Sequence, residues 1–293
     1  LGTGVHLLPF HHPVELAHRI AYLDHLAQGR FMLGIGSSGL PSDCAVFNVN
    51  MQEGEHREMT RESLDIMLKI WQNAGPGPFE YRGKFWNFNG IETMFDTCNI
   101  YLKPFQKPHP PIAVAAGSFR SPTVAIAGEN GYIPMCLAFS TEYINSQWEA
   151  IEEGALKGGR TPSRKEWRMV RDVYVADTDE QARDEVLNGA TGKAWREYLM
   201  PLFLQLGFGP GMKHRPDVPD EDLTVEYMAE HYWLIGSPET VAGKLRKLFN
   251  EIGGFGGLLM LVYDYGGDNG GWEKSTRLLV QEVMPRLADL TVD

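Results

Sequence analysis

Short apolar runs that alternate with segments of helical periodicity constrain the fold of this chain more than any other feature. Residues 31–36, 112–116 and 132–137 are short and apolar, and each run leads into a loop or a helical pattern. This alternation is typical of parallel strands joined by crossover helices. The sequence therefore predicts an α/β fold with a buried parallel sheet.

The first helix shows the periodic pattern clearly. Leu16, Ile20 and Leu23 lie on one face of a helix that is predicted to begin at Pro13 and to end before Gly29. Thr178 and Ser237 precede acidic residues and are predicted to cap two later helices. Further helices are predicted over 55–71, 122–129, 141–153 and 272–287, and an aromatic stretch over 79–88 predicts a small hairpin.

The number of strands favours an incomplete barrel. The three runs above, together with residues 1–9, 169–176 and 257–263, give six strands, whereas a (β/α)8 barrel needs eight. An open sheet would leave a long apolar edge uncovered. We therefore expect a TIM barrel of which two β/α units are missing from this chain. The expected organisation is one domain over 1–293, N-terminally incomplete, with insertions near 37–55, 75–110 and 205–232.

Charge and composition exclude several classes of partner. The formal net charge of −11 argues against nucleic acid or an anionic membrane as partner. Three cysteines without metal-ligand spacing favour reduced thiols and no metal site. We see no long apolar span and no secretion leader, so we expect a cytoplasmic protein.

Two loops after predicted strands have the composition of a phosphate site. In a barrel the chemistry lies in the loops at the carboxyl ends of the strands. Small residues, backbone N–H groups, hydroxyls and a cation are what a phosphate needs. The predicted phosphate-binding residues are Gly36, Ser37 and Ser38 in one loop and Ala116, Gly117, Ser118, Arg120 and Ser121 in the other.

Arg57 lies in the first turn of its predicted helix. The helix dipole disfavours a cation at that end unless the cation holds an anion. The alternative is a surface salt bridge with Glu53 or Asp65. Both interpretations stay open at this point.

The histidines offer candidates for an acid/base group without deciding between them. His11 and His12 end the first strand, and neighbours in an extended chain point in opposite directions. Only one of them can therefore face a cavity, and either can instead cap the loop. His6 lies deeper on the same strand. His12 and His6 are the catalytic candidates, and the sequence assigns a catalytic base to neither.

Apolar and aromatic residues near the predicted strand ends are candidates to contact a substrate. These residues are Met135, Phe139, Tyr263 and Tyr265, for which an ordinary place in the core or rim is the alternative. The insertion near 205–232 is rich in glycine and proline, and long loops of this kind are often functional. We expect it to act as a lid that is weakly ordered without substrate.

Several motifs in the same order resemble those of one enzyme family. They are Gly2-Thr3-Gly4-Val5, Leu8-Pro9-Phe10-His11-His12-Pro13, Gly29-Arg30-Phe31, Ala115-Ala116-Gly117-Ser118, Ser237-Pro238-Glu239-Thr240 and Val283-Met284-Pro285-Arg286. The chain resembles the luciferase-like flavin-dependent monooxygenases over nearly its whole length, and its C-terminal pattern is similar to the limonene monooxygenase branch. The resemblance implies a TIM barrel of the bacterial luciferase type, in which the strand at Gly2–Val5 is the third, so that the first two β/α units are expected to be missing from this chain.

The same resemblance assigns roles to individual residues. It implies a strained, often cis, peptide between Gly4 and Val5 beneath the isoalloxazine ring of FMN. It places Arg57, Gly117 and Ser118 at the flavin phosphate. Where luciferases often carry an arginine this chain has Ser37 and Ser38, so Arg57 and Arg120 are expected to balance the phosphate charge.

The implied reaction is that of a two-component monooxygenase. Reduced FMN, supplied by a separate NAD(P)H:flavin reductase, reacts with O2 through a C4a-peroxyflavin and oxygenates a small apolar organic substrate. Family members commonly pair two barrels, which implies a homodimer. Two alternatives remain, a deazaflavin-dependent hydride-transfer enzyme and a flavin-binding protein without turnover.

Overall fold

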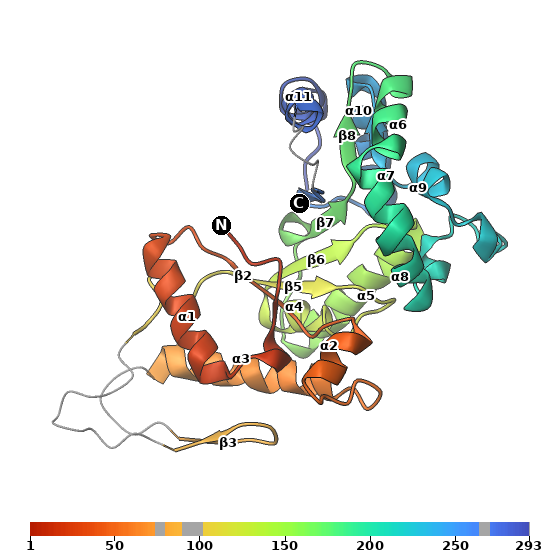
Figure 1. The fold of residues 1–293 in the computed structure, drawn as a ribbon. Coiled ribbons are helices and arrows are strands. Elements are labelled where there is room, and N and C mark those ends of the chain that lie inside the picture. The colour runs from red at the N-terminus through yellow and green to blue at the C-terminus, as the bar shows by residue number, and fades with distance from the viewer. Residues whose placement is uncertain (74–79, 90–101, 264–269, 293) are drawn as a thin grey trace. The chain divides into compact units, whose positions relative to one another are not determined.

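The computed structural model describes residues 1–73, 80–89, 102–263 and 270–292 (Figure 1). The chain forms two compact units, Leu1–Ala115 and Ala116–Asp293. Tyr265, the start of the aromatic stretch at Phe79, one of the three cysteines (Cys98) and parts of the predicted insertion near 75–110 lie outside the described residues.

Unit 1 contains three parallel strands with β2 in the middle. β1 (His6–Leu7) pairs with β2 (Leu33–Gly36), and β2 pairs with β5 (Ile112–Ala116). Every residue of β2 is buried, which is why its sequence is an uninterrupted apolar and glycine run. The predicted strand over 1–9 is shorter than expected, although Gly2 forms a further parallel bridge with Met32.

The helices of unit 1 cover these strands. α1 (Pro13–Leu26) begins with proline in its first turn and α3 (Glu55–Asn73) follows the predicted range, so both predictions are confirmed. The indole Nε1 of Trp71 donates to the carbonyl oxygen of Ala17 at 3.0 Å and joins the two helices. The stretch 37–50 was expected to be a loop but contains α2 (Pro41–Val46), and η1 (Leu8–Phe10) follows β1.

A small antiparallel hairpin occupies residues 81–88, as predicted. β3 (Tyr81–Arg82) pairs with β4 (Asn87–Phe88). The carboxylate of Glu62 accepts hydrogen bonds from the backbone amides of the turn, those of Lys84, Phe85 and Trp86, at 3.0–3.2 Å. One helix side chain on α3 thereby anchors the hairpin turn.

Unit 2 has its own set of three parallel strands, with β7 in the middle. β6 (Ile133–Leu137) and β10 (Gly257–Met260) both pair with β7 (Arg168–Arg171). β10 ends three residues earlier than the predicted end at Tyr263. Parallel pairing confirms the α/β class expected from the sequence.

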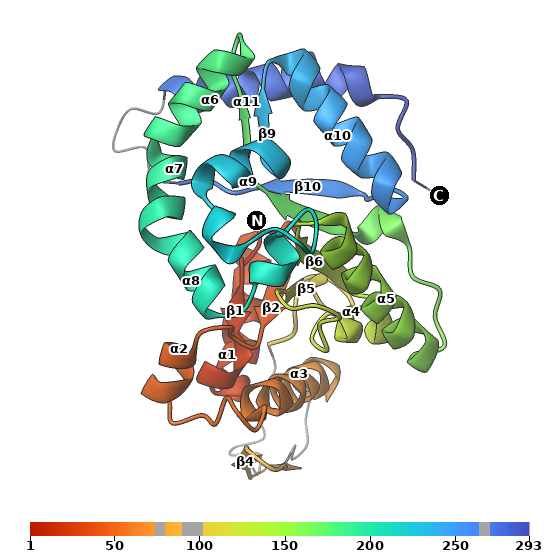
Figure 2. The same cartoon turned by 90° about the vertical axis from the view of Figure 1, so that its right-hand side faces the viewer.

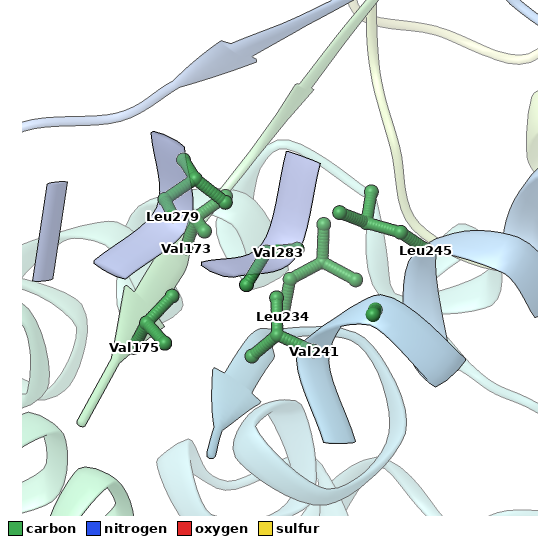
Figure 3. Packing of buried hydrophobic residues seen from close by; sticks show 8 residues of the cluster. Val173, Val175, Leu234, Val241, Leu245, Leu279 and Val283 are labelled. Atoms are coloured by element: carbon green, nitrogen blue, oxygen red, sulfur yellow. The ribbon is translucent and has the colours of Figure 1, made fainter. Parts of the chain in front are cut away.

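The predicted single strand over 169–176 is wrong, because the chain changes sheet at Asp172. β8 (Val173–Val175) leaves β7 and pairs in parallel with β9 (Leu234–Gly236) in a separate sheet. Figure 3 shows why this is favourable, since β8 and β9 bury branched side chains against α10 (Pro238–Ile252) and η6 (Leu279–Val283). The buried cluster consists of Val173, Val175, Leu234, Val241, Ala242, Leu245, Leu279 and Val283.

Side-chain caps begin two helices of unit 2, and a glycine contact joins two others. Thr178 and Ser237 accept hydrogen bonds from Gln181 N and Thr240 N, so both predicted caps are confirmed. α4 (Ala125–Asn130) is shorter than its predicted range, which began at Pro122, whereas α5 (Thr141–Lys157) extends beyond its predicted end. A Cβ atom on Gly154 of α5 would lie 2.0 Å from the carbonyl oxygen of Ala125, so glycine lets these two helices touch.

The remaining helices of unit 2 are short and follow one another closely. Figure 2 shows α6, α7 and α8 running in succession along one side of this unit. Their bounds are α6 (Asp179–Asn188), α7 (Ala190–Ala194), η3 (Trp195–Leu199), α8 (Met200–Gln205), η4 (Gly209–Met212), η5 (Asp220–Asp222), α9 (Val225–His231) and α10 (Pro238–Ile252). The predicted helix over 272–287 is α11 (Gly270–Leu278) continued by η6 (Leu279–Val283) and η7 (Met284–Leu287), and a short turn η2 (Arg164–Glu166) precedes β7.

The insertion near 205–232 carries regular structure along part of its length, and its role as a lid that is weakly ordered without substrate stays a prediction. It contains the helical turns η4, η5 and α9. Met212 is fully buried, and the amide of Ser140 donates to the carbonyl oxygen of Gly211 at 3.0 Å. Buried contacts and backbone hydrogen bonds therefore hold the segment against unit 2.

Within the described ranges, no helix is both long enough and apolar enough to cross a bilayer.

Candidate functional site

The peptide bond between Gly4 and Val5 is cis, as the resemblance implied. A Cβ atom added at Gly4 would meet no heavy atom within 4 Å beyond its chain neighbours, and Gly4 is exposed. The backbone next to this cis bond therefore has an open face. A planar ring could approach it without meeting a side chain at that position.

The glycines of β2 are explained by packing against the segment that precedes β1. A Cβ on Gly34 would lie 2.0 Å from the carbonyl oxygen of Thr3, and one on Gly36 would lie 2.8 Å from Cγ2 of Val5. Gly34, Gly36 and Gly39 have the G-x-G-x-x-G spacing of dinucleotide-binding loops. Because two of these glycines lie within the strand, the spacing is a consequence of strand packing.

Ser37 and Ser38 follow β2 and have different environments. Ser37 is buried, at 8% exposure. Ser38 has a positive φ of 72°, and its hydroxyl donates to Asp43 Oδ2 at 2.9 Å while accepting from the amide of Leu40 at 3.1 Å. The Ser38 hydroxyl thus shapes the turn before α2, and a phosphate role for it stays a prediction.

Arg57 lies in the first turn of α3, as predicted, and it is exposed. Its guanidinium makes no hydrogen bond or ion pair with another residue of the described ranges. The alternative salt bridge with Asp65 is not formed, because Asp65 pairs with Lys69 at 2.7 Å. An unpaired cation at a helix N-terminus is suited to an external anion.

The two candidate histidines are engaged in the fold in different ways. His12 caps α1 by accepting from the amide of Val14 through Nδ1 at 3.3 Å, which is the structural role we left open. His6 is half-buried and lies edge-on to His11, with ring centroids 5.5 Å apart. Burial, followed by His11, lowers the pKa of His6, so it is neutral near pH 7.

The loop after β5 brings Gly117 against an aromatic side chain of unit 2. A Cβ on Gly117 would lie 3.4 Å from Cζ of Phe208, and the carbonyl oxygen of Ser118 accepts from Nε2 of Gln147. Ser118 is exposed and Ser121 is 3% exposed. Gly117 and Ser118 continue directly from Ala116 at the end of β5, as the phosphate-loop prediction requires.

Arg120, the other predicted phosphate ligand, is already paired. Its guanidinium forms ion pairs with Glu149 at 3.0 Å and with Glu153, both on α5. Its amide donates to Ser146 Oγ at 3.2 Å. A phosphate would have to displace two carboxylates from Arg120, whereas Arg57 has no such competitor.

Aromatic side chains of unit 2 form a continuous wall near the ends of β6 and β7. Phe139 contacts Phe203 at a centroid distance of 5.6 Å, and Phe203 contacts Phe208 at 5.3 Å and Trp195 at 5.6 Å. Phe139 is 5% exposed. Phe208 lies next to both Gly117 and Phe139. The predicted phosphate residue and the predicted substrate residue therefore border the same aromatic cluster.

The polar end of this aromatic wall is a buried carboxylate that the sequence analysis did not identify. Tyr263 donates its hydroxyl to Asp172 Oδ1 at 2.6 Å, and Trp195 Nε1 is shared between Tyr263 Oη at 2.9 Å and Asp172 Oδ1 at 3.3 Å. Asp172 is 4% exposed, and burial raises its pKa to about 6. One carboxylate thus satisfies two aromatic donors.

Arg171 precedes Asp172 and is also buried, at 7% exposure. Nε donates to the carbonyl oxygen of Ala138 and Nη2 to that of Phe139, each at 2.9 Å. Burial lowers the pKa of Arg171 to about 10. Arg171 therefore holds the end of β6 beside β7.

A narrow apolar pocket lies between these groups, at the carboxyl ends of β6, β7 and β10. Its volume of about 20 Å³ leaves room for roughly one water molecule. Met135, which also belongs to the predicted substrate residues, lies lower on β6 opposite Arg168. The pocket is lined by Leu137, Ala138, Phe139, Val170, Arg171, Asp172, Trp195, Phe203, Met228, Tyr232, Trp233 and Leu261.

A larger pocket of unit 2, of about 590 Å³, has a lining that is partly polar and partly apolar. Its lining includes Lys213, His214, His231 and Lys247. The two histidine rings stack at 4.0 Å, and Lys213 pairs with Asp220 at 2.6 Å. Among the described residues, no group of three or more His, Cys, Asp and Glu could hold a metal ion.

Parallel strands joined by helices, with the candidate residues in the loops that follow the strands, define an α/β protein of the barrel type. The family model for luciferase-like monooxygenases matches residues 1–254. The chain belongs to this family, and the α/β barrel of the luciferase type expected from its sequence is confirmed.

Individual relatives agree with this assignment. The chain is 31% identical to the 3,6-diketocamphane 1,6-monooxygenase of Pseudomonas putida, over 96% of this chain and 78% of the relative. It is 30% identical to the limonene 1,2-monooxygenase of Rhodococcus erythropolis, over 97% of this chain and 68% of the relative. The solved oxygenating constituent of 3,6-diketocamphane monooxygenase from Pseudomonas putida, in complex with FMN, superimposes with a TM-score of 0.88, at 31% identity, over 99% of this chain and 79% of that structure.

The sequence contained a signal for the residues that were missed. Arg171 and Asp172 interrupt the apolar run from Met169 to Val175. Two adjacent charges inside a buried strand require partners. No local pattern pointed to Trp195, because its role depends on contacts with residues far along the chain.

Proposed function

We propose that this chain is the oxygenating component of a two-component, FMN-dependent monooxygenase that acts on small cyclic ketones. A separate NAD(P)H:flavin reductase supplies the reduced flavin. The solved relative described as an oxygenating constituent supports this division of labour, since it holds FMN and matches 99% of this chain.

The observation that carries the proposal is the unpaired guanidinium of Arg57. It lies at the N-terminus of α3 without a partner in the described chain, so it can form charge-assisted hydrogen bonds to the FMN phosphate. Gly117 and Ser118, with their backbone and hydroxyl groups, stay predicted phosphate residues on the strength of the family resemblance alone. The open backbone at Gly4 would accommodate the flavin ring.

Reduced FMN, when bound, supplies the two electrons that activate O2, so that one oxygen atom enters the substrate and the other leaves as water. The residues of this chain bind, orient and exclude water. Arg57 would fix the phosphate end of the cofactor. Phe139, Phe203 and Trp195 would form a dry wall for the substrate.

The apolar pocket favours a compact hydrocarbon skeleton over a charged substrate. Leu137, Phe139, Phe203 and Leu261 contribute its apolar surface. Because the pocket has a volume of about 20 Å³, a bicyclic ketone would enter only after the aromatic side chains shift. The names of the diketocamphane relatives agree with a bicyclic ketone as the substrate class.

The proposal is tested with photoreduced FMN, a bicyclic ketone such as norcamphor, and oxygen gas labelled with the heavy isotope. We expect a lactone that carries one labelled oxygen atom, formed without NAD(P)H. Reduction of the ketone to an alcohol by a reduced deazaflavin, with no lactone from FMN, would instead establish hydride transfer. Tight FMN binding without any product would indicate a binding protein without turnover.

A further inference from the structure

We propose that a side pocket of unit 2 binds a small organic acid and that Arg171 holds the carboxylate of this ligand. The side pocket has a volume of about 210 Å³. The predicted phosphate residues Gly117 and Ser118 are not among the described residues that line it, so ligand binding there requires neither flavin nor oxygen. The lining includes Phe139, Arg171, Tyr232, Trp233, Lys247 and Leu248.

Arg171 carries a buried positive charge. The residue is 7% exposed. Its Nε and Nη2 atoms donate to backbone carbonyl oxygens of Ala138 and Phe139, and Nη1 has no acceptor within the described ranges. The adjacent carboxylate of Asp172 forms no ion pair with Arg171 and accepts instead from two aromatic donors. Because an isolated buried charge is costly, the guanidinium is suited to an anion that enters the side pocket.

Two further donors in the same wall also lack an acceptor. Among the described residues, neither Tyr232 Oη nor Trp233 Nε1 has a hydrogen-bond partner, and both atoms are buried. The Cζ atom of Arg171 lies 6.0 Å from the centre of the Tyr232 ring, so the guanidinium and this phenol share one region of the wall. Ordered water can accept from such donors but brings no negative charge for Arg171.

The other charged side chains of the side pocket do not neutralise Arg171. Lys244 Nζ donates to two backbone carbonyl oxygens, at 2.9 and 3.3 Å. Glu230 and Glu251 are exposed, and Glu251 pairs with Lys247 at 3.8 Å. A solvated carboxylate gains little from a distant buried cation. Within the described part of the chain, neither carboxylate forms an ion pair with Arg171, so that cation remains available to a ligand.

Apolar side chains beside the cation define the rest of the ligand. Phe139, Leu234 and Leu248 contribute them, and the volume of the side pocket exceeds the share of about 30 Å³ that one water molecule takes. Small-molecule sites typically combine such apolar surface with a few polar groups that fix orientation. A carboxylate on a compact hydrocarbon body therefore fits this lining better than inorganic phosphate does.

The test is calorimetric titration of the purified protein in Tris buffer without carboxylate or phosphate. Cyclohexanecarboxylate is the acid, and cyclohexylmethanol is its neutral counterpart with the same hydrocarbon body. We expect saturable binding of the acid and binding of the alcohol that is weaker by about tenfold or more, because the alcohol forms no charge-assisted hydrogen bond. Absence of binding by the acid, or equal affinities for the two compounds, would overturn the proposal.

Inorganic phosphate distinguishes an organic acid from any small anion. We expect phosphate to bind more weakly than the acid, since it leaves the apolar part of the lining uncovered. Phosphate that binds as tightly as the acid would overturn the assignment of an organic acid.

Arg171→Met identifies the group that holds the carboxylate. Methionine keeps an apolar stem without the charge, and we expect the affinity for the acid to fall about tenfold or more. Arg168→Gln is the matched control on the same strand, because Arg168 pairs with Glu166 at 3.4 Å and does not belong to the described lining. Unchanged affinity in Arg171→Met, or equal losses in the two variants, would contradict the role of Arg171.

Lys247→Gln serves if Arg171→Met does not fold, since the Lys247 side chain is 75% exposed. Loss of this second cation of the lining should weaken binding of the acid about threefold, the effect of an exposed charge. Affinity for the acid that stays the same in Lys247→Gln would then count against an anion site. Failure of the protein to oxygenate ketones would leave each of these titrations interpretable.

Discussion

A single hydroxyl group joins Thr3 to Gly34 in both directions. Oγ1 of Thr3 donates to the carbonyl oxygen of Gly34 and accepts from its amide, each at 2.9 Å. Both bonds lie next to the cis peptide between Gly4 and Val5. Thr3 therefore holds the predicted flavin-facing backbone to the buried strand β2.

Replacement of Thr3 by valine should destabilise unit 1. Valine has the same shape but leaves the amide of buried Gly34 without its partner, at a cost of about 2 kcal/mol in the free energy of unfolding. Urea denaturation measures the change. Thr3→Ser keeps the hydroxyl and should retain most of the stability, so equal losses in the two variants would contradict the role of the hydrogen bonds.

Alanine should have opposite effects at two helical glycines of unit 2. Gly154→Ala places a Cβ 2.0 Å from the Ala125 carbonyl oxygen and should force α4 and α5 apart, at a cost of about 2 kcal/mol or more. Gly243 lies in α10, and an added Cβ there meets nothing within 4 Å. Gly243→Ala should therefore stabilise by about 0.5–1 kcal/mol. Thermal unfolding should show a lower melting temperature for Gly154→Ala and a higher one for Gly243→Ala than for the wild type.

Asp172 should make stability depend on pH in a defined window. Its pKa rises from 3.8 to about 6 in the folded protein, so between these values the folded state binds more protons than the unfolded state. The free energy of unfolding therefore falls as pH rises through this window, by about 3 kcal/mol for this group. Asp172→Asn removes this titrating carboxyl group and with it the pH dependence that it contributes. Denaturation near pH 4 and near pH 7 measures the free energy of unfolding of both proteins. Relative to the wild type, the variant should be more stable at pH 7 than at pH 4. Parallel pH profiles would refute the raised pKa of Asp172.

Arg57→Gln should weaken FMN binding by about tenfold or more, because one charge-assisted contact to the phosphate is lost. Quenching of flavin fluorescence measures the dissociation constant. Riboflavin, which lacks the phosphate, should bind the variant and the wild type equally. Arg19→Gln removes another exposed arginine of unit 1, which pairs with Glu15, and should leave FMN affinity unchanged. Equal losses for FMN and riboflavin would place Arg57 away from the phosphate.

Local sequence patterns predicted most of the regular elements. The apolar stripe of α1, the caps at Thr178 and Ser237 and the aromatic hairpin each depend on neighbouring residues, and each is confirmed. The resemblance placed the cis bond at Gly4 correctly.

The prediction failed where distant residues decide the outcome. The run from Met169 to Ala176 was assigned to one strand, but pairing of β8 with β9, about 60 residues later in the chain, divides it. The same division creates the position of Asp172, whose partners Trp195 and Tyr263 lie far away in sequence. The adjacent charges of Arg171 and Asp172 were a signal within the run, but no pattern there could have indicated the pairing of β8 with β9 or the partners of Asp172.

The division at Asp172 also limits how unit 2 can change during evolution. One residue separates a strand of the sheet that carries the pocket from a strand of the sheet that supports α10. Inserting or deleting a residue there would move the side chains of one of the two strands to the opposite face of its sheet, while those of the other strand would keep their places. Length variation among relatives should therefore gather in the short helices after β8 and avoid this junction.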